Sequence, residues 1–179
     1  MTRFVPRAWL GTCLGLALSL FGCGSLNAGP SGAADAQHAL LGAVAPAFDL
    51  PSADGKQRVS LAKVSGQVVV VDFWATWCIP CRQSFPAYQR LSQKFDGQAV
   101  ILGISVDEEP SGIALFARET GAEFALGWDE AQTTSKQYQP PTMPTSYVLD
   151  KHGVVRFVHS GFYAGEEQQL ETEIRSLLQ

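Results

Sequence analysis

Cys78 and Cys81, two cysteines three residues apart, are the side chains of this chain best placed to do chemistry. They follow an apolar run over residues 68–74 that predicts a buried strand, and they precede residues 80–95, which predict a helix. This junction places Cys78 at a helix N-terminus, where the helix dipole and unpaired N–H groups favour the thiolate. Cys81 lies one turn further on, near enough to close a disulfide or to resolve a mixed disulfide. The pair therefore predicts thiol–disulfide exchange.

The other cysteines and the histidines do not offer an equally good explanation of the pair. A disulfide closing so short a loop contributes little to folding, because chain-entropy stabilisation grows with loop length. A structural zinc site needs four ligands, and no second pair with this spacing exists. We expect no metal and no cofactor other than the Cys78–Cys81 disulfide. The remaining candidates for ligands have no zinc-site spacing: Cys13, Cys23, His38, His152 and His159.

The first 22 residues predict export. Arg3 and Arg7 form a positive region before the apolar stretch 8–21, which is short for a transmembrane helix. Leu20-Phe21-Gly22-Cys23 resembles a bacterial lipoprotein signal, in which the cysteine is lipidated and becomes the new N-terminus. We expect a signal peptide over residues 1–22 and a lipoprotein on the periplasmic side of a membrane. An ordinary cleaved signal and an uncleaved anchor stay open.

Composition divides the rest of the chain into a tether and one domain. Residues 23–41 are rich in Gly, Ala and Ser and predict a flexible tether, and residues 42–179 are long enough for one domain with its own core. The chain has 13 basic and 17 acidic residues and shows no basic stripe, so nucleic acid is not expected as a partner. We expect a monomer held at the membrane through its lipid.

Strands and helices alternate along the domain. Residues 45–50 and 59–61 flank a turn signal at 53–56 and predict a small hairpin. Besides the elements around the cysteines, a second buried strand is predicted over 99–106, and a hairpin turn at 150–153. This order predicts a sheet covered by helices on both faces, with an antiparallel pair at one edge. The other predicted elements are helices over 111–120, 131–138 and 166–178 and strands over 145–149 and 154–159.

The segment Val70-Val71-Asp72-Phe73-Trp74-Ala75-Thr76-Trp77-Cys78-Ile79-Pro80-Cys81-Arg82 resembles a thioredoxin-fold active site. The domain as a whole resembles the membrane-tethered TlpA/ResA group of thiol–disulfide oxidoreductases, through segments 45–50, 54–61, 143–150 and 161–162. The resemblance implies a thioredoxin-like α/β/α sandwich with a mixed sheet and an N-terminal hairpin extension. It also implies a redoxin-type enzyme.

The same resemblance implies roles for single residues. Cys78 is the nucleophile and Cys81 the resolving thiol. Pro144 is the cis-proline facing the pair, and its backbone edge is where an extended substrate can pair. Met143 departs from the smaller or branched residue that is common before this proline. The substrate-binding residues are expected to be Trp77, Ile79, Pro80, Met143 and Pro144.

Asp72 stands six residues before Cys78, where thioredoxins carry a buried acid. A carboxyl in a dry strand has a raised pKa, which suits it to proton transfer at Cys81. The alternative is a structural aspartate held by local hydrogen bonds. The TlpA/ResA group often has a glutamate three residues after the second cysteine, where this chain has Ser84. Any acid at the site is therefore expected to come from Asp72.

Ile79 and Pro80 bring neither charge nor a side-chain donor to Cys78, and strong oxidants need such donors to stabilise their reduced form. We expect a reducing pair that receives electrons from a membrane donor and reduces disulfides of exported proteins. The resemblance suggests apocytochrome c as one client.

Two other functions remain open. One is a peroxiredoxin-like peroxidase, although Val71 and Ala75 occupy the positions of the proline and hydroxyl residue expected upstream of its reactive cysteine. The other is a copper chaperone that uses both thiolates and His159. Peroxide consumption and copper titration would separate these functions from disulfide reduction.

Overall fold

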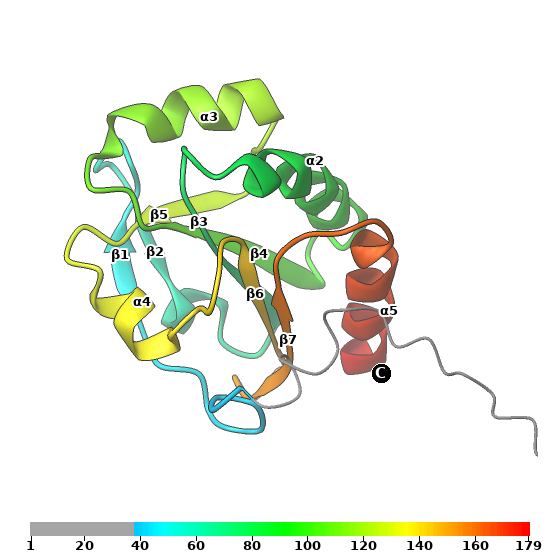
Figure 1. Ribbon diagram of the computed structural model, residues 1–179. Coiled ribbons are helices and arrows are strands. Elements are labelled where there is room, and N and C mark those ends of the chain that lie inside the picture. The colour runs from blue at the N-terminus through cyan, green and yellow to red at the C-terminus, as the bar shows by residue number, and fades with distance from the viewer. Residues whose placement is uncertain (1–37) are drawn as a thin grey trace, which may run out of the picture.

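The strand predicted over residues 68–74 lies at the centre of the sheet in the computed structural model, which describes residues 38–179 (Figure 1). All seven residues of this strand, β3 (Val68–Trp74), are buried. Its neighbours are β4 (Ala99–Ser105), which is parallel to it, and β6 (Thr145–Leu149), which is antiparallel. β5 (Ala125–Trp128) and β7 (Val155–Ser160) complete the order β5-β4-β3-β6-β7. The predicted mixed sheet with an antiparallel pair at one edge is confirmed.

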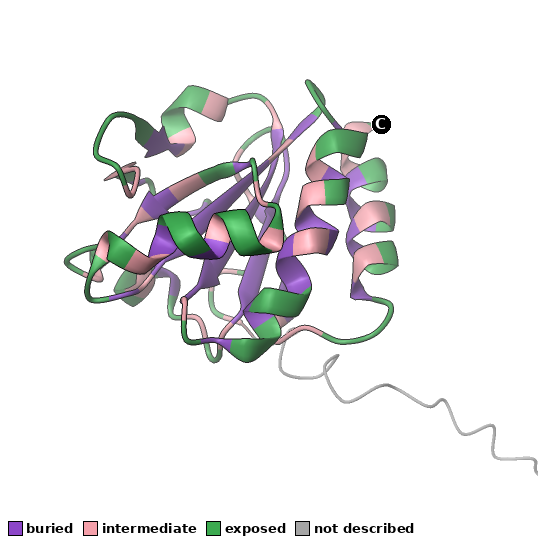
Figure 2. Ribbon diagram, turned by 90° about the horizontal axis from the view of Figure 1, so that it is seen from above, coloured by how far each residue is buried: buried purple, intermediate pink, exposed green. Residues whose placement is uncertain are grey.

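Two apolar cores cover the two faces of this sheet. On one face pack α2 (Ile79–Lys94), α3 (Ile113–Thr120) and α5 (Glu166–Leu178). On the other face pack α4 (Thr133–Tyr138) and the N-terminal segment (Figure 1). The buried residues of α2 and α5 form stripes turned toward the sheet, and their outer faces are exposed (Figure 2). The predicted three-layer arrangement is therefore confirmed.

The predicted N-terminal hairpin is present as a two-stranded antiparallel sheet. Its strands are β1 (Asp49–Pro51) and β2 (Arg58–Ser60), and η1 (Leu61–Val64) follows directly. A bridge between Ser52 and Gly127 ties the hairpin to β5. The hairpin thus lies beside β5, at the edge of the main sheet opposite β7.

The elements differ from the predicted ones in three places. The first hairpin strand, predicted over 45–50, is only β1 (Asp49–Pro51), and the residues before it include Pro46, which has no N–H to donate. β5 was not predicted, because it has only four residues and contains Gly127, which has a low strand propensity. The helix predicted over 111–120 begins as a 3-10 helix, η2 (Pro110–Gly112), before α3 starts at Ile113.

The chain already contacts the domain before residue 42. The imidazole of His38 packs edge-on against the ring of Tyr147, and Leu40 packs against the core on the same face. The predicted signal peptide and Cys23 lie outside the described residues. Within residues 38–179, none of the helices combines the length and the apolar character needed to cross a membrane.

Candidate active site

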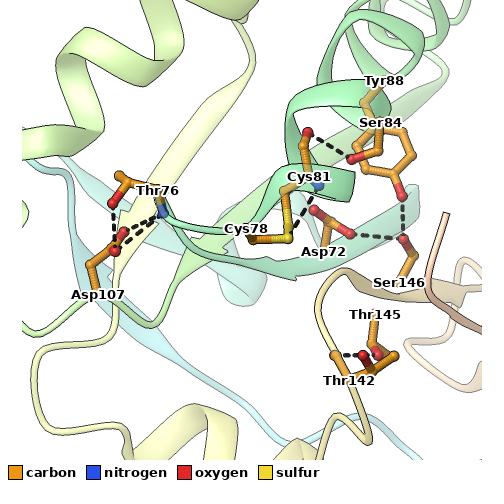
Figure 3. Close-up of a disulfide and its surroundings, with 10 residues drawn as sticks. All are labelled: Asp72, Thr76, Cys78, Cys81, Ser84, Tyr88, Asp107, Thr142, Thr145 and Ser146. Carbon is orange, nitrogen blue, oxygen red and sulfur yellow. Dashed lines mark hydrogen bonds between the residues drawn. A yellow bond between two sulfur atoms is a disulfide. The ribbon is translucent and has the colours of Figure 1, made fainter.

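Cys78 and Cys81 form a disulfide at the start of α2 (Figure 3). Cys78 is the N-cap residue, and its Sγ accepts a hydrogen bond of 3.1 Å from the backbone N–H of Cys81. Pro80 occupies one of the first helical positions, where its missing N–H costs nothing. In the reduced protein the same N–H group and the helix dipole favour a thiolate at Cys78. The predicted position of Cys78 at a helix N-terminus is confirmed.

The side chains around the disulfide differ sharply in exposure. Trp77 is 69% exposed and Ile79 is 73% exposed, whereas Cys78 is 4% exposed and Cys81 is fully buried. Two large apolar side chains therefore stand in solvent beside a nearly covered disulfide, and exposed apolar side chains of this kind are typical of contact surfaces. Trp74 lies in the core instead, with its ring against those of Phe85 and Phe116.

The peptide bond between Met143 and Pro144 is cis. The next residue, Thr145, is the first of β6 and pairs with Phe73 of β3. This register places Pro144 beside the end of β3 from which the chain continues to Cys78. Met143 is partly buried and packs against both cores. The strand register thus brings together the proline segment and the cysteine segment, which are more than 60 residues apart in sequence.

Asp72 is fully buried in β3, behind the start of α2. Its Oδ1 accepts a 2.9 Å hydrogen bond from the Ser146 hydroxyl, which in turn lies 2.7 Å from the Tyr88 hydroxyl (Figure 3). Its Oδ2 is buried and has no hydrogen-bond partner among the described residues. Burial raises the pKa of Asp72 well above its ordinary value, and the nearby Glu166 adds to this, while the hydrogen bond from Ser146 opposes it.

Ser146 and Tyr88 belong to the site, although no motif in the sequence indicates either of them. Ser146 is the direct antiparallel neighbour of Asp72 between β6 and β3, and Tyr88 comes from the buried face of α2. Ser146 could have been found once β6 was placed beside β3, because side chains of paired residues lie on the same face. Nothing in the sequence indicates that Tyr88 reaches it.

Asp107 is a second acid that sequence reasoning missed. It is 6% exposed, and its carboxylate accepts hydrogen bonds from the backbone N–H and the hydroxyl of Thr76 and from the hydroxyl of Ser105. Asp107 follows β4 as Thr76 follows β3, and the carboxyl ends of parallel strands meet at one edge of a sheet. Asp107 therefore fixes the residue two positions before Cys78 (Figure 3).

His159 is buried in β7, and its Nε2 lies 2.7 Å from Oε2 of Glu173 in α5. Within residues 38–179, no group of three or more His, Cys, Asp or Glu side chains is arranged to hold a metal ion. His159, the third ligand in the copper hypothesis, therefore already contacts Glu173 through its Nε2. Val71 and Ala75, at the positions discussed for a peroxidase, are fully buried.

Comparison with known proteins agrees with this arrangement. Residues 41–158 match the AhpC/TSA family. The thiol-disulfide oxidoreductase ResA of Bacillus anthracis is 31% identical over 123 residues, which cover 68% of this chain and 70% of that protein. The thioredoxin-like protein YneN of Bacillus subtilis is 29% identical over 136 residues, or 74% of this chain and 79% of that protein.

A solved structure shows the same fold. The crystal structure of a putative thiol:disulfide interchange protein DsbE from Chlorobium tepidum superimposes with a TM-score of 0.73 at 34% sequence identity. The match covers 78% of this chain and 98% of the other. The thioredoxin-like fold inferred from the resemblance is confirmed.

Proposed function

This chain belongs to the AhpC/TSA family and is a thiol–disulfide oxidoreductase of the ResA/DsbE type, and we propose that its Cys78–Cys81 pair reduces disulfide bonds of exported proteins. The observation that carries this proposal is the disulfide at the N-terminus of α2 with Trp77 and Ile79 exposed beside it. The pair can accept and give two electrons, and the apolar side chains offer a client a place to dock.

The reaction begins with the dithiol form. The Cys78 thiolate attacks one sulfur of the client disulfide, so that a Cys78–client disulfide forms and the client S–S bond breaks. The second client sulfur leaves with the electron pair as a thiolate and takes a proton from water. The N–H of Cys81 and the helix dipole lower the free energy of the attacking thiolate.

Resolution of the mixed disulfide needs a base near Cys81. Asp72, as the carboxylate, takes the proton of the Cys81 thiol, and the Cys81 thiolate attacks Sγ of Cys78. The Cys78–Cys81 bond forms, the Cys78–client bond breaks, and the client leaves as a thiolate that water protonates. Two electrons have passed from the enzyme to the client. Because burial raises the pKa of Asp72, its carboxylate is a stronger base than an exposed one.

The surroundings of Cys78 support a reducing rather than an oxidising pair. Among the described residues, the hydrogen bond that Cys78 Sγ receives comes from the Cys81 N–H, and no side chain donates to it. The nearest cation in sequence, Arg82, is paired with Glu119 at 2.6 Å and lies over the ring of Phe116. Strong oxidants need extra stabilisation of the thiolate, which this site supplies only weakly.

The proposed clients are exported proteins whose cysteines must be reduced, with apocytochrome c as one candidate from the resemblance. A CxxCH peptide in its disulfide form is the matching substrate for an assay. The electrons are proposed to come from a membrane donor. Lipidation of Cys23 would hold the domain at the periplasmic side of the membrane, with residues 1–22 removed and the tether running from Cys23 to His38, the first described residue, which packs on the domain.

The mechanism is tested with two cysteine variants. Cys78→Ser should abolish reduction of the peptide disulfide, and Cys81→Ala should accumulate a mixed disulfide with it. The double variant is the matched control and should accumulate none. Undiminished reduction by Cys78→Ser would contradict the mechanism. The location is tested separately: Cys23→Ser should move the protein out of the membrane fraction, and unchanged membrane association would contradict lipidation.

A further inference from the structure

Two buried hydroxyl groups lie in series with the carboxyl of Asp72, and the proposed reaction assigns no role to them. The hydroxyls of Tyr88 and Ser146 lie in series with Asp72, at 2.7 Å and 2.9 Å. Ser84 is fully buried one helical turn before Tyr88, and its hydroxyl donates to the backbone carbonyl of Cys81 at 3.1 Å. Ser84 stands where the TlpA/ResA resemblance implies a glutamate, so the helix supplies hydroxyls to this site instead of a second acid.

The direction of the hydrogen bonds in this series follows from counting protons. Ser146 has one hydroxyl proton, and it donates that proton to Oδ1 of Asp72. The proton in the Tyr88–Ser146 bond must therefore come from Tyr88. Burial raises the pKa of Tyr88 well above its ordinary value, so its hydroxyl keeps the proton that it donates. The hydroxyl protons of Tyr88 and Ser146 therefore both point along the hydrogen-bond series toward Oδ1 of Asp72.

We propose that Tyr88 and Ser146 are positioning residues of the dithiol reaction, which direct the exchangeable proton of Asp72 to Oδ2. Oδ1 is already occupied by a donated proton, whereas Oδ2 has no hydrogen-bond partner among the described residues. In Figure 3 the oxygen that is not bonded to Ser146 is turned toward Cys81. The proton that Cys81 gives up in the resolution step is therefore received, and later returned, on this oxygen. This inference rests on the proposed function.

Other polar groups reach Asp72 from each packed element. Glu166, fully buried at the start of α5, interacts with both Asp72 and Tyr88. The His159–Glu173 pair lies one strand further, since His159 is the cross-strand neighbour of Ser146. From β4 the neighbour of Asp72 is Gly103, which has no side chain. None of these groups is needed for the proton count above.

The test measures the protonation of Asp72 and the rate of resolution together. The full-length protein is labelled with ¹³C in its aspartate carboxyls, and the Asp72 signal is followed against pH. Because Ser146 donates to the carboxylate, Ser146→Ala should move the Asp72 titration to higher pH, and Tyr88→Phe should move it the same way by less. Ser146→Thr keeps a hydroxyl and should restore the wild-type titration. Tyr147→Phe, which alters the next residue of β6, is the matched control and should not move it.

The rate should follow the titration. The pH at which mixed-disulfide resolution speeds up, the pH limb of the rate, should move to higher values together with the Asp72 titration. At pH 7, Ser146→Ala should resolve the mixed disulfide roughly tenfold more slowly, as expected for one lost hydrogen bond to a charged group. In Asp72→Asn the limb should disappear, and adding Ser146→Ala should then change nothing further.

Two results would overturn the inference. One is an Asp72 titration that neither Ser146→Ala nor Tyr88→Phe moves. The other is a rate of mixed-disulfide resolution whose pH dependence is the same in the wild type and in Asp72→Asn. If that enzyme still reduces disulfides, the proposed function stands and only the inference fails. A wild-type protein that reduces no disulfide would instead refute the proposed function, and the carboxyl titration would still test the hydrogen-bond series.

Discussion

Replacing Asp107 with alanine should loosen the loop that carries Cys78. The carboxylate accepts from the Thr76 N–H at 3.1 Å, from the Thr76 hydroxyl at 2.8 Å and from the Ser105 hydroxyl at 2.7 Å. Bonds to a charged acceptor contribute about 1.5–3 kcal/mol each, but Thr76 is partly exposed, so water can replace part of them. We expect Asp107→Ala to lower the free energy of unfolding by about 3 kcal/mol.

That loss corresponds to a fall in Tm of about 6–12 °C for a protein of this size. Thermal unfolding of the oxidised protein measures it, and the rate of peptide-disulfide reduction measures the effect on Cys78. Asp129→Ala is the matched control: Asp129 is also buried and accepts hydrogen bonds from the N–H groups of Thr134 and Ser135 at the start of α4. It should lower Tm while the rate per folded molecule stays the same. An Asp107→Ala protein with the wild-type Tm and rate would refute the role of Asp107.

Three further predictions concern other residues. Burial raises the pKa of Asp72 above its ordinary value of 3.8, so the stability that its neutral form contributes is complete below about pH 4 and is lost as pH rises toward the folded-state pKa. Asp72→Asn should therefore remove this loss of stability, as measured by urea unfolding between about pH 4 and 9. An unchanged dependence of the free energy of unfolding on pH would contradict this prediction. Trp77→Ser should raise KM for the peptide roughly tenfold with no change in Tm, and an unchanged KM would exclude Trp77 from docking. His159→Ala leaves the carboxylate of Glu173 buried without this contact and should cost about 3 kcal/mol, whereas Glu171→Ala, which removes surface ion pairs with Lys94 and Arg175, should cost much less. A copper affinity that falls in His159→Ala would instead favour the chaperone hypothesis.

The sequence predicted the elements that bear the strongest patterns. The apolar run at Val68–Trp74 and the amphipathic stretch at Glu166–Leu178 have the bounds that were expected. β5 was missed because Gly127 weakens its strand pattern. In the folded protein, a Cβ atom at Gly127 would come within 3.4 Å of Val59 and Leu50 of the hairpin. The residue that weakens the strand pattern is thus required by a contact that only the folded protein shows.

The site divides in the same way. Cys78 and Cys81 share one local motif, and the resemblance to thioredoxins adds Asp72 from the same strand-to-helix segment. Ser146 depends on β6 lying beside β3, and Tyr88 depends on which face of α2 packs on that pair. Asp107 depends on two parallel strands ending at one edge. These three residues act through contacts between distant segments, which no local pattern encodes.

The central claim is that the Cys78–Cys81 pair is a reductant, and its midpoint potential tests this most directly. Equilibration with glutathione or dithiothreitol buffers, followed by alkylation of free thiols, gives the value. The account predicts a potential near that of thioredoxin, about −270 mV. A potential near about −120 mV would make the protein a donor of disulfides and would contradict both the proposed direction of electron flow and the role given to the surroundings of Cys78.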